Sequence, residues 1–354
     1  MAGRPGELVI GGFDGTDLPA RFAAALRDGR RGGAILFKRN VRGGPTQVAA
    51  LGRAVHAACP QPLLGVDQEG GRVARLQAPC LEVPPMRTVA SWGDGSLAER
   101  IAHAVGLELA ALGFTIDFAP VLDVNTCPQN PVIGDRAFGD DASTCARFGA
   151  AWIRGLQASG LLACGKHFPG HGDTTKDSHL DLPVVDLDRE RIARVELAPF
   201  RAAVDAGVAS LMTAHVVYSA LDSDLPGTLS PAVCTTLREQ IGFRGLLVSD
   251  DLEMRAVAAR WSIEEAAVLA VAAGCDALLV CENEDKQERA VDALEREAAR
   301  SPAFRARCDD AIARARAARG RTATRPATDD DSLSRVIGGP QSRAVAAEMA
   351  RRAT

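Results

Sequence analysis

The sequence is poor in aromatic residues and has neither a cysteine motif nor a long apolar run. Aromatic residues make up 4% of the 354 residues, so Ala, Val, Leu and Gly must fill most of the interior. That composition suits an α/β protein, whose parallel strands are short Val, Ile and Leu runs. The nine cysteines are odd in number and include no C-x-x-C pair. They indicate buried thiols in a reducing compartment, and argue against a disulfide framework or a zinc site.

Two further absences concern targeting and partners. The N-terminus has no apolar segment long enough for a signal peptide, and no stretch reaches membrane-spanning length, which predicts a cytoplasmic protein without a membrane partner. The formal net charge is −4, with both signs interspersed along the chain. Because nucleic-acid binding needs a clustered basic face to neutralise phosphates, nucleic acid is not expected as a partner.

What the chain does have is a repeated alternation of short apolar runs and longer stretches rich in Ala, Arg and Glu. The apolar runs predict eight strands, at residues 8–11, 33–37, 63–67, 116–121, 163–167, 210–215, 245–250 and 277–281. The longer stretches predict helices, at residues 19–28, 46–58, 97–112, 144–159, 189–206, 231–240, 263–273, 286–299 and 302–319. Eight strand-then-helix units predict an α/β fold of the (β/α)8 TIM-barrel type. An open doubly wound sheet is the alternative, but the segment GGFDG after the first strand matches its glycine-rich dinucleotide turn poorly.

The predicted organisation is one catalytic domain followed by a short tail. The barrel domain covers residues 1–320, and residues 321–354 form a linker and a C-terminal helical tail without a second domain. A Thr-, Pro- and Asp-rich linker occupies residues 322–331, and residues 343–352 have a helical Ala- and Arg-rich pattern. We expect this tail to pack on the barrel surface or to remain mobile.

Five polar residues lie at the C-terminal ends of predicted strands, and they are Asp67, Lys166, His167, His215 and Asp250. In TIM-barrel enzymes the active site is built from those strand ends and the loops that follow them. Five such placements are hard to attribute to chance, although a strand-end residue such as His215 can also be a packed supporting residue.

Three of the six histidines fall in the single run KHFPGHGDTTKDSH, residues 166–179. Within it, Asp177 and His179 are two residues apart, so an extended segment places both side chains on one side. Asp177 can then accept a hydrogen bond from one ring nitrogen of His179 while the other nitrogen faces a substrate. This pairing favours the imidazolium form and predicts that His179 is a general acid near neutral pH.

The run SDDLE, residues 249–253, places three carboxylates at the mouth of the seventh strand, which is typical of a metal site or of a nucleophile with its neighbours. A metal site is disfavoured. His167 and His171 have the spacing of a zincin helix, but Pro169 and the glycines around it prevent a regular helix. No metal ion and no organic cofactor are therefore expected.

The same groups suit a glycosidase in which Asp250 attacks an anomeric carbon and His179 protonates the departing oxygen.

The run at residues 166–179 resembles the motif of the β-N-acetylglucosaminidases of glycoside hydrolase family 3, bacterial enzymes of peptidoglycan recycling. Further stretches agree with that family, and they are GVDQEGGRV at 65–73, FAPVLDV at 118–124, IGDRAFG at 133–139, MTAH at 212–215 and SDDL at 249–252. Together these stretches cover the barrel from about the third strand to the seventh.

The resemblance implies a retaining exo-β-N-acetylglucosaminidase that releases terminal N-acetylglucosamine from cell-wall muropeptides. It implies that Asp250 is the nucleophile and that His179 is the acid/base with Asp177 as its partner. Asp67, Arg136, Lys166 and His167 are implied to bind the terminal sugar, and we place His215 with them. Two-domain relatives continue into a second domain, and the segment around 341–350 is similar to the helix that leads there.

Three alternatives stay open at this point. Relatives with this motif also transfer the sugar to phosphate, so a β-N-acetylglucosaminide phosphorylase is the nearest alternative. The others are a metal-dependent barrel amidohydrolase and a sugar-binding protein without catalysis. The expected partner is a small carbohydrate, an N-acetylglucosamine-containing cell-wall fragment, and a monomer is favoured.

Overall fold

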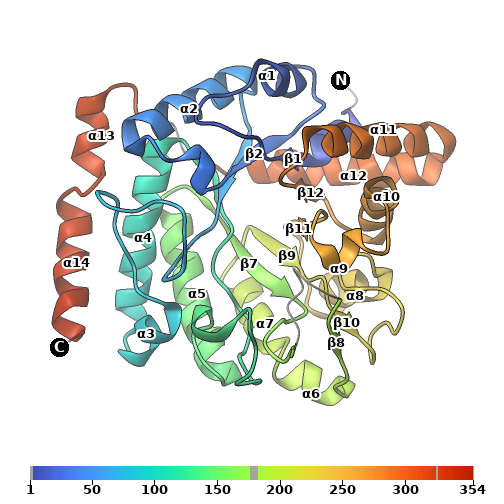
Figure 1. Cartoon of the computed structure of the whole chain (residues 1–354). Coiled ribbons are helices and arrows are strands. Elements are labelled where there is room, and N and C mark those ends of the chain that lie inside the picture. Colours follow the sequence, from blue (N-terminus) through green and yellow to red (C-terminus); the bar gives the residue numbers. More distant parts are fainter. Residues whose placement is uncertain (1–2, 176–181, 324–325, 354) are drawn as a thin grey trace.

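A computed structural model describes residues 3–175, 182–323 and 326–353 of the chain. Within these residues, eight parallel strands close into a barrel in the order β1-β2-β3-β6-β7-β9-β11-β12 and back to β1 (Figure 1). The barrel strands are β1 (Val9–Gly11), β2 (Gly33–Leu36), β3 (Leu63–Val66), β6 (Ile116–Asp117), β7 (Leu162–Phe168), β9 (Ser210–Thr213), β11 (Leu246–Asp251) and β12 (Ala277–Val280). The predicted (β/α)8 fold is therefore confirmed.

Helices form the outer layer and connect each strand to the next (Figure 1). They are α1 (Ala20–Arg27), α2 (Gly44–Ala58), α3 (Met86–Ser91), α4 (Gly95–Leu112), α5 (Ala142–Ala158), α6 (Arg189–Arg194), α7 (Ala198–Asp205), α8 (Pro231–Thr235), α9 (Arg255–Ala258), α10 (Ile263–Ala273), α11 (Glu284–Arg300) and α12 (Pro302–Arg319). Several begin at polar caps, as where the Asp94 carboxylate accepts from the Leu97 amide at the start of α4. Such caps satisfy amides that lack a partner in the first turn.

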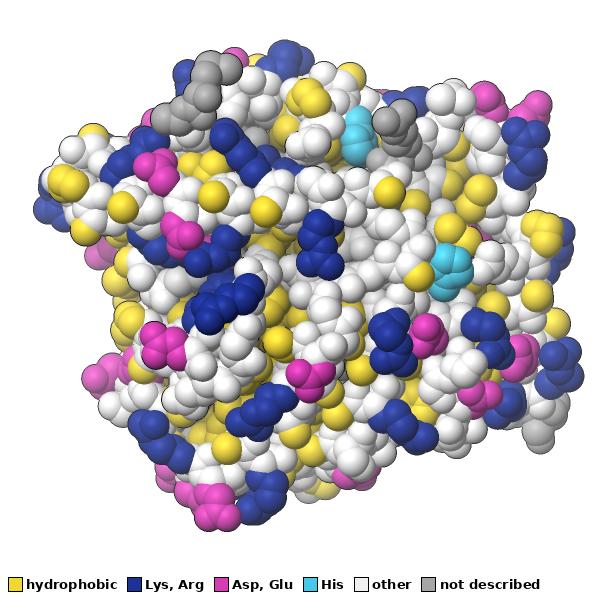
Figure 2. Space-filling model, turned by 180° about the vertical axis from the view of Figure 1, so that it is seen from behind, with side chains coloured by type: hydrophobic (Ala, Val, Ile, Leu, Met, Phe, Trp, Pro, Cys, Tyr) yellow, Lys and Arg dark blue, Asp and Glu magenta, His cyan; other side chains and the backbone are white. Residues whose placement is uncertain are grey.

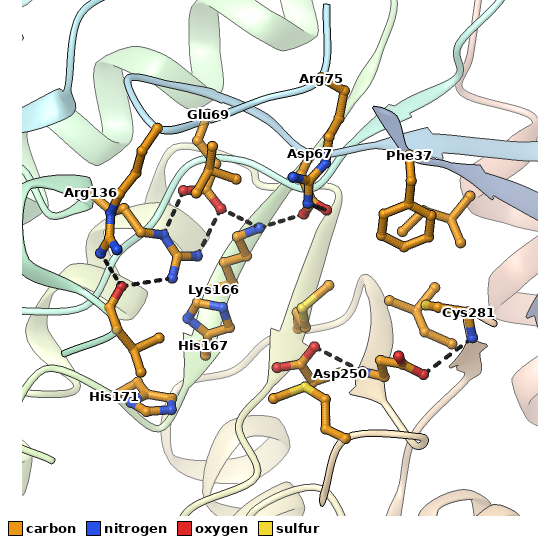
Figure 3. A pocket seen from close by; sticks show the side chains of 18 of the residues that line it. Phe37, Asp67, Glu69, Arg75, Arg136, Lys166, His167, His171, Asp250 and Cys281 are labelled. Carbon is orange, nitrogen blue, oxygen red and sulfur yellow. Dashed lines mark hydrogen bonds and ion pairs between the residues drawn. The ribbon is translucent and has the colours of Figure 1, made fainter. Parts of the chain in front are cut away.

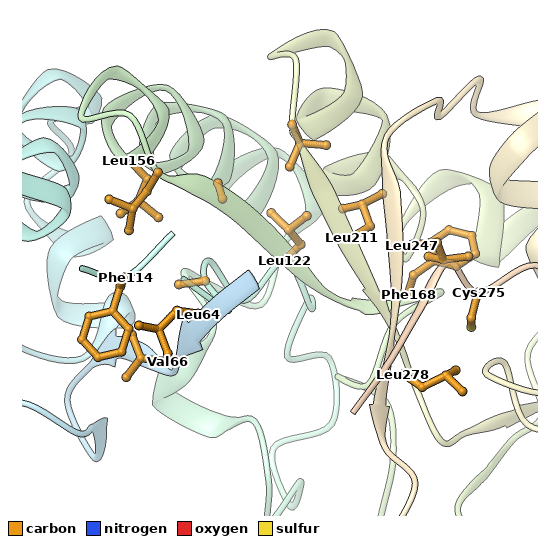
Figure 4. Packing of buried hydrophobic residues seen from close by; sticks show 14 of the residues in the cluster. Leu64, Val66, Phe114, Leu122, Leu156, Phe168, Leu211, Leu247, Cys275 and Leu278 are labelled. Carbon is orange, nitrogen blue, oxygen red and sulfur yellow. The ribbon is translucent and has the colours of Figure 1, made fainter. Parts of the chain in front are cut away.

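Two apolar layers follow from the alternation of side chains along each strand. Leu64 and Val66 of β3 face the surrounding helices (Figure 4), whereas Leu63 belongs to the cluster inside the barrel. In β11, Leu247 faces outward, and its neighbours in the strand fill the interior. Because both faces of a parallel strand are buried, truncating any of these leucines to alanine is expected to cost about 2–5 kcal/mol.

The end of the barrel away from the strand C-termini carries an ion cluster around a buried carboxylate, the base cluster. Its members are Asp276, Arg238, Arg307 and Arg314. Asp276 immediately precedes β12 and is fully buried. Its carboxylate also accepts a hydrogen bond from the Leu247 amide at 3.0 Å. Both carboxylate oxygens are thereby satisfied, as a buried charge requires.

Two predicted boundaries were wrong. The strand expected over residues 116–121 is regular only over Ile116–Asp117, with an isolated bridge from Val121 to Lys166, because Pro120 has no amide hydrogen for the ladder. The helix expected over residues 189–206 is two helices, α6 and α7, and Pro199 lies in the first turn of the second, where proline is tolerated.

Two short sheets outside the barrel were not predicted. One pairs β4 (Gln68–Gly70) with β5 (Val73–Ala74), and the other pairs β8 (Val184–Val185) with β10 (Val217–Tyr218). The first lies in the loop after β3, and the second joins the loop after β7 to the loop after β9.

The tail folds into two helices, α13 (Asp330–Val336) and α14 (Pro340–Arg352), which lie along α4 (Figure 1). The buried carboxylate of Glu108 in α4 accepts hydrogen bonds from the Gly338 amide at 2.9 Å and the Ser342 hydroxyl at 2.6 Å. Its other oxygen accepts from the Leu81 amide at 2.7 Å. One side chain thus joins the tail to a loop of the barrel.

The surface carries mixed charge. Figure 2 shows Lys and Arg side chains interspersed with Asp and Glu on the face opposite to that of Figure 1. None of the described helices combines the length and the apolarity that crossing a lipid bilayer would require.

Candidate active site

A cavity of about 440 Å³ opens at the C-terminal ends of the strands (Figure 3). Of the predicted site residues, it is lined by Asp67, Arg136, Lys166, His167 and Asp250. The barrel brings these residues together from sequence positions up to 183 apart, since 250 − 67 = 183. Their placement agrees with the expectation drawn from the strand ends, and their roles stay predictions.

One wall of the cavity is an ion network, the cavity cluster, made of Asp67, Glu69, Arg136 and Lys166 (Figure 3). The Lys166 ammonium group lies 2.8 Å from a carboxylate oxygen of Asp67 and 2.6 Å from one of Glu69. Burial alone would lower the pKa of Lys166, but the two carboxylates outweigh it and raise that pKa above its usual value. Lys166 is therefore charged, and it keeps one of its three donors for another acceptor.

Arg136 joins the same cluster through a two-pronged pair with Glu69. Its Nε and Nη2 atoms each donate to a Glu69 oxygen at 2.8 Å. Burial would raise the pKa of Glu69, but Arg136 and Lys166 hold it at about 2. Burial would also raise the pKa of Asp67, but Lys166 and Arg75 outweigh it and keep that pKa well below its usual value. Both carboxylates of the cluster are therefore ionised. The result is a cavity wall of fixed charges that is suited to bind the polar groups of a ligand.

His167 is oriented by Asp123, which is fully buried below it. The ring Nδ1 of His167 lies 2.7 Å from one Asp123 oxygen, and the other oxygen accepts from the backbone amides of His167 and His171. A ring held in this way directs its Nε2 toward the cavity. β7 shifts its register between Gly165 and Phe168, so that the consecutive residues Lys166 and His167 both line the cavity.

Asp250 lies at the end of β11 on the side of the cavity across from the cavity cluster (Figure 3). Its Oδ1 atom accepts from the Asp251 amide at 2.8 Å. Burial would raise the pKa of Asp250, but the electrostatic interactions with His215 and His167 outweigh it and lower the pKa below its usual value. Asp250 is therefore a carboxylate near neutral pH, as a nucleophile must be.

Asp251 differs from its neighbour in both contacts and charge. One of its oxygens accepts from the amides of Glu253 and Cys281, so it holds the ends of β11 and β12 together. Burial raises its pKa to about 7. The two adjacent carboxyls are thus distinguished by their surroundings, and the role of Asp250 as the reactive one stays a prediction.

His215 is completely buried and is not among the residues that line the cavity. Its ring nitrogens lie 2.8 Å from the Thr228 hydroxyl and 2.8 Å from the backbone carbonyl oxygen of Asp251. These contacts suit a residue that supports the end of β11. Its prediction as a sugar-binding residue stays untested, and the geometry favours the supporting alternative.

The predicted acid/base pair, Asp177 and His179, lies outside the described residues. The preceding part of that run is ordered by short polar contacts, including a ring contact of His171 Nδ1 with the Thr174 hydroxyl at 2.9 Å. Burial and the nearby His167 lower the pKa of His171 to about 4, so this ring is neutral. His171 lines the cavity without being a proton donor near neutral pH.

The wall next to Asp250 is apolar. Ile35, Met212 and Leu279 line it together with Phe37, whose ring lies 4.7 Å from the guanidinium carbon of Arg39 and 5.5 Å from that of Arg75. A cavity with one charged and one apolar wall suits a sugar, whose hydroxyl groups and C–H faces need different neighbours.

The sequence interpretation missed three functional candidates, Glu69, Arg75 and Asp123. Glu69 and Arg75 belong to the loop after β3, and Arg75 donates to Asp67 at 2.8 Å. All three lie within or next to the segments 65–73 and 118–124 that carried the family resemblance. Their polar side chains in otherwise apolar or Gly-rich stretches were a usable signal.

No group of three or more His, Cys, Asp or Glu among residues 3–175, 182–323 and 326–353 is arranged to hold a metal ion. The carboxylates of the cavity cluster already have Lys and Arg as counter-ions.

Comparisons with known proteins agree with this geometry. Residues 14–316 match the N-terminal domain of glycosyl hydrolase family 3. The chain is 43% identical to the β-hexosaminidase of Thiobacillus denitrificans over 274 residues, which are 75% of this chain and 76% of that protein. It is 40% identical to the β-hexosaminidase of Vibrio cholerae serotype O1 over 284 residues, which are 79% of this chain and 83% of that protein.

Solved structures show the same similarity. A glycoside hydrolase family 3 β-N-acetylglucosaminidase from Paenibacillus sp. superposes with a TM-score of 0.86 at 39% identity, over 94% of this chain and 66% of that one. NagZ from Neisseria gonorrhoeae, solved with N-trifluoroacetyl-D-glucosamine, superposes with a TM-score of 0.82 at 29% identity over the whole of both chains.

Proposed function

The chain belongs to glycosyl hydrolase family 3 and is a β-N-acetylhexosaminidase, and we propose that it removes terminal N-acetylglucosamine with retention of configuration. The observation that carries this proposal is the position of Asp250, an ionised carboxylate across the cavity from the cavity cluster. A fixed nucleophile opposite a sugar-sized polar wall is the arrangement that a covalent glycosyl-enzyme needs.

In the first step the terminal sugar occupies the cavity, where Lys166, Arg136 and His167 donate to its hydroxyl and N-acetyl oxygens and Asp67 accepts from a hydroxyl. A carboxylate oxygen of Asp250 attacks the anomeric carbon. The bond from that carbon to the leaving oxygen breaks, and His179 gives the leaving oxygen its proton.

In the second step a water molecule loses a proton to His179 and attacks the same carbon. The bond to Asp250 breaks, and N-acetylglucosamine leaves with its original configuration. The charged wall needs no rearrangement during either step, because its counter-ions are already in contact.

The proposed substrates are peptidoglycan-derived muropeptides in the cytoplasm. Such fragments carry carboxylates, and an imidazole acid at position 179 avoids the repulsion that a carboxylate acid would meet near an anionic leaving group. The names of the relatives, β-hexosaminidase and β-N-acetylglucosaminidase, support the sugar class.

The test is trapping with a 2-acetamido-2-deoxy-5-fluoro sugar, followed by intact-mass measurement and peptide mapping. A mass increase on Asp250 is expected, and a label on another residue would reassign the nucleophile. Product analysis with and without inorganic phosphate is run beside it. Sugar 1-phosphate as the product would replace the hydrolase by a phosphorylase.

A further inference from the structure

A second cavity, of about 460 Å³, lies beside the first and shares Arg75 with it. It is formed by the loop after β2, the start of α2 and the loop after β5. Its lining residues are Lys38, Val41, Arg42, Gly44, Pro45, Arg75, Leu76, Gln77, Ala78 and Cys80. Three of these side chains are cationic, and no acidic side chain lines the cavity among the residues that the structure describes.

Two of the three cations are without a counter-ion in the described part of the chain. Lys38 and Arg42 are exposed, and neither makes an ion pair there. Arg39, which lies between them in the sequence, pairs with Asp14 at 3.0 Å. Unpaired cations that line one cavity together give it a positive potential, which attracts an anion.

The third cation is shared between the two cavities. Arg75 gives Nη2 to Asp67 at 2.8 Å, and its side chain is 21% exposed. Its guanidinium group therefore adds positive charge to the second cavity while it holds a carboxylate of the first. The helix α2 begins in the same place at Gly44 with no side-chain cap, so its first amide groups add positive potential.

We propose that this second cavity is an anion-binding site for a carboxylate or phosphate group and that Arg75 connects its occupancy to the sugar cavity. Lys38, Arg42 and Arg75 supply the charge, and Gln77 supplies an amide. The anion comes from one of two sources. It is the acidic part of a substrate whose sugar lies in the first cavity, which rests on the proposed function, or it is a free small anion.

The test uses two variants with the same change in charge. Lys38→Ala/Arg42→Ala removes the proposed site. Arg27→Ala/Arg244→Ala is the matched control, because both residues are exposed, form no ion pair in the described chain and precede strands at the opposite end of the barrel. Binding of inorganic phosphate and of citrate is measured by calorimetry at constant ionic strength. The same measurement is repeated in an Asp250→Asn background with a cell-wall fragment as the ligand. The peptide carboxylates of this fragment are either free or amidated.

The unaltered chain and the control are expected to bind at least one anionic probe about tenfold more tightly than Lys38→Ala/Arg42→Ala. A loss with phosphate or citrate identifies a free anion. A loss confined to the fragment with free carboxylates identifies the substrate as the source. Equal binding of every probe by both double variants overturns the site. The phosphate and citrate measurements need no turnover, so they report on this site even if the proposed activity fails.

Discussion

The two ends of the barrel each hold an ion cluster around buried carboxylates, and the two clusters differ in what lies beside them. The base cluster gathers three partly exposed arginines around the carboxylate of Asp276, and two of these arginines also pair with Asp310. The cavity cluster has two carboxylates and two cations and forms the wall of a cavity of about 440 Å³. The same pairing chemistry therefore joins the start of β12 to the outer helices at one end and lines a cavity at the other. We expect mutations to separate these roles.

The largest effect is expected at the cavity end, for Asp250→Asn. This change removes the proposed nucleophile while keeping the shape of the side chain, so turnover of a chromogenic N-acetylglucosaminide should fall by about four orders of magnitude. The urea midpoint should stay within error of the parent, because the amide still fits the site. Retention of a tenth of the turnover or more would contradict the assignment.

At the base of the barrel, we expect a mutation to lower stability and to leave activity unchanged. Asp276→Ala leaves three arginines without their shared carboxylate, and the free energy of unfolding should fall by about 3–5 kcal/mol while kcat/KM of the folded fraction is unchanged. Urea unfolding and steady-state kinetics measure the two quantities. Asp276→Asn is the milder companion if the alanine variant does not fold. A selective loss of kcat/KM at full stability would show that the base communicates with the cavity.

Acid should weaken the cavity end of the barrel. Glu69 has a pKa of about 2 in the folded protein against a reference value of 4.5, so its contribution is complete above pH 4.5 and is lost as the pH falls toward 2. The stability difference between the parent and Glu69→Gln should shrink across that window by an amount on the order of 3 kcal/mol. Urea unfolding at pH 7, 4.5 and 2 measures it.

The control for this pH effect is Glu190→Gln, which breaks only the exposed pair with Arg194. Its difference from the parent should be small at every pH. A stability difference for Glu69→Gln that is constant with pH would show that Glu69 gains nothing from its cations.

The smallest effect concerns the tail, which belongs to neither end. Glu108→Gln should cost about 1–3 kcal/mol and speed proteolysis of residues 326–353, because a buried acceptor of three hydrogen bonds loses its charge. Glu348→Gln is the matched control, since its pair with Arg100 is partly exposed and should contribute less than about 1 kcal/mol. Equal proteolysis of the two variants would remove Glu108 as the anchor.

The sequence predicted the barrel because each strand is a short apolar run and each helix is a longer stretch rich in Ala, Arg and Glu. The closing contact of β1 with β12 followed from the number of units. The strand containing Asp117 was overestimated, since an apolar run does not reveal that Pro120 interrupts the ladder. The sheet β4–β5 was missed because its residues, QEG and VA, lack any apolar alternation.

For the site, strand ends predicted Asp67, Lys166, His167 and Asp250, because parallel strands bring their C-terminal ends to one rim. The sequence did not predict which of these side chains form ion pairs with one another. That Glu69 pairs with both Lys166 and Arg136 depends on side chains that meet across the rim, and neither spacing nor periodicity encodes such a meeting.

The carboxylate of Glu108 also determines where a force applied to the C-terminal helices acts on the rest of the protein. It holds Gly338 and Ser342 with one oxygen and Leu81 with the other, and Leu81 follows Cys80, which lines the second cavity. Tension applied to the C-terminal helices would thus be delivered to that loop before it reached any barrel strand, and a pull on α14 in a force experiment should release the loop while the barrel stays intact.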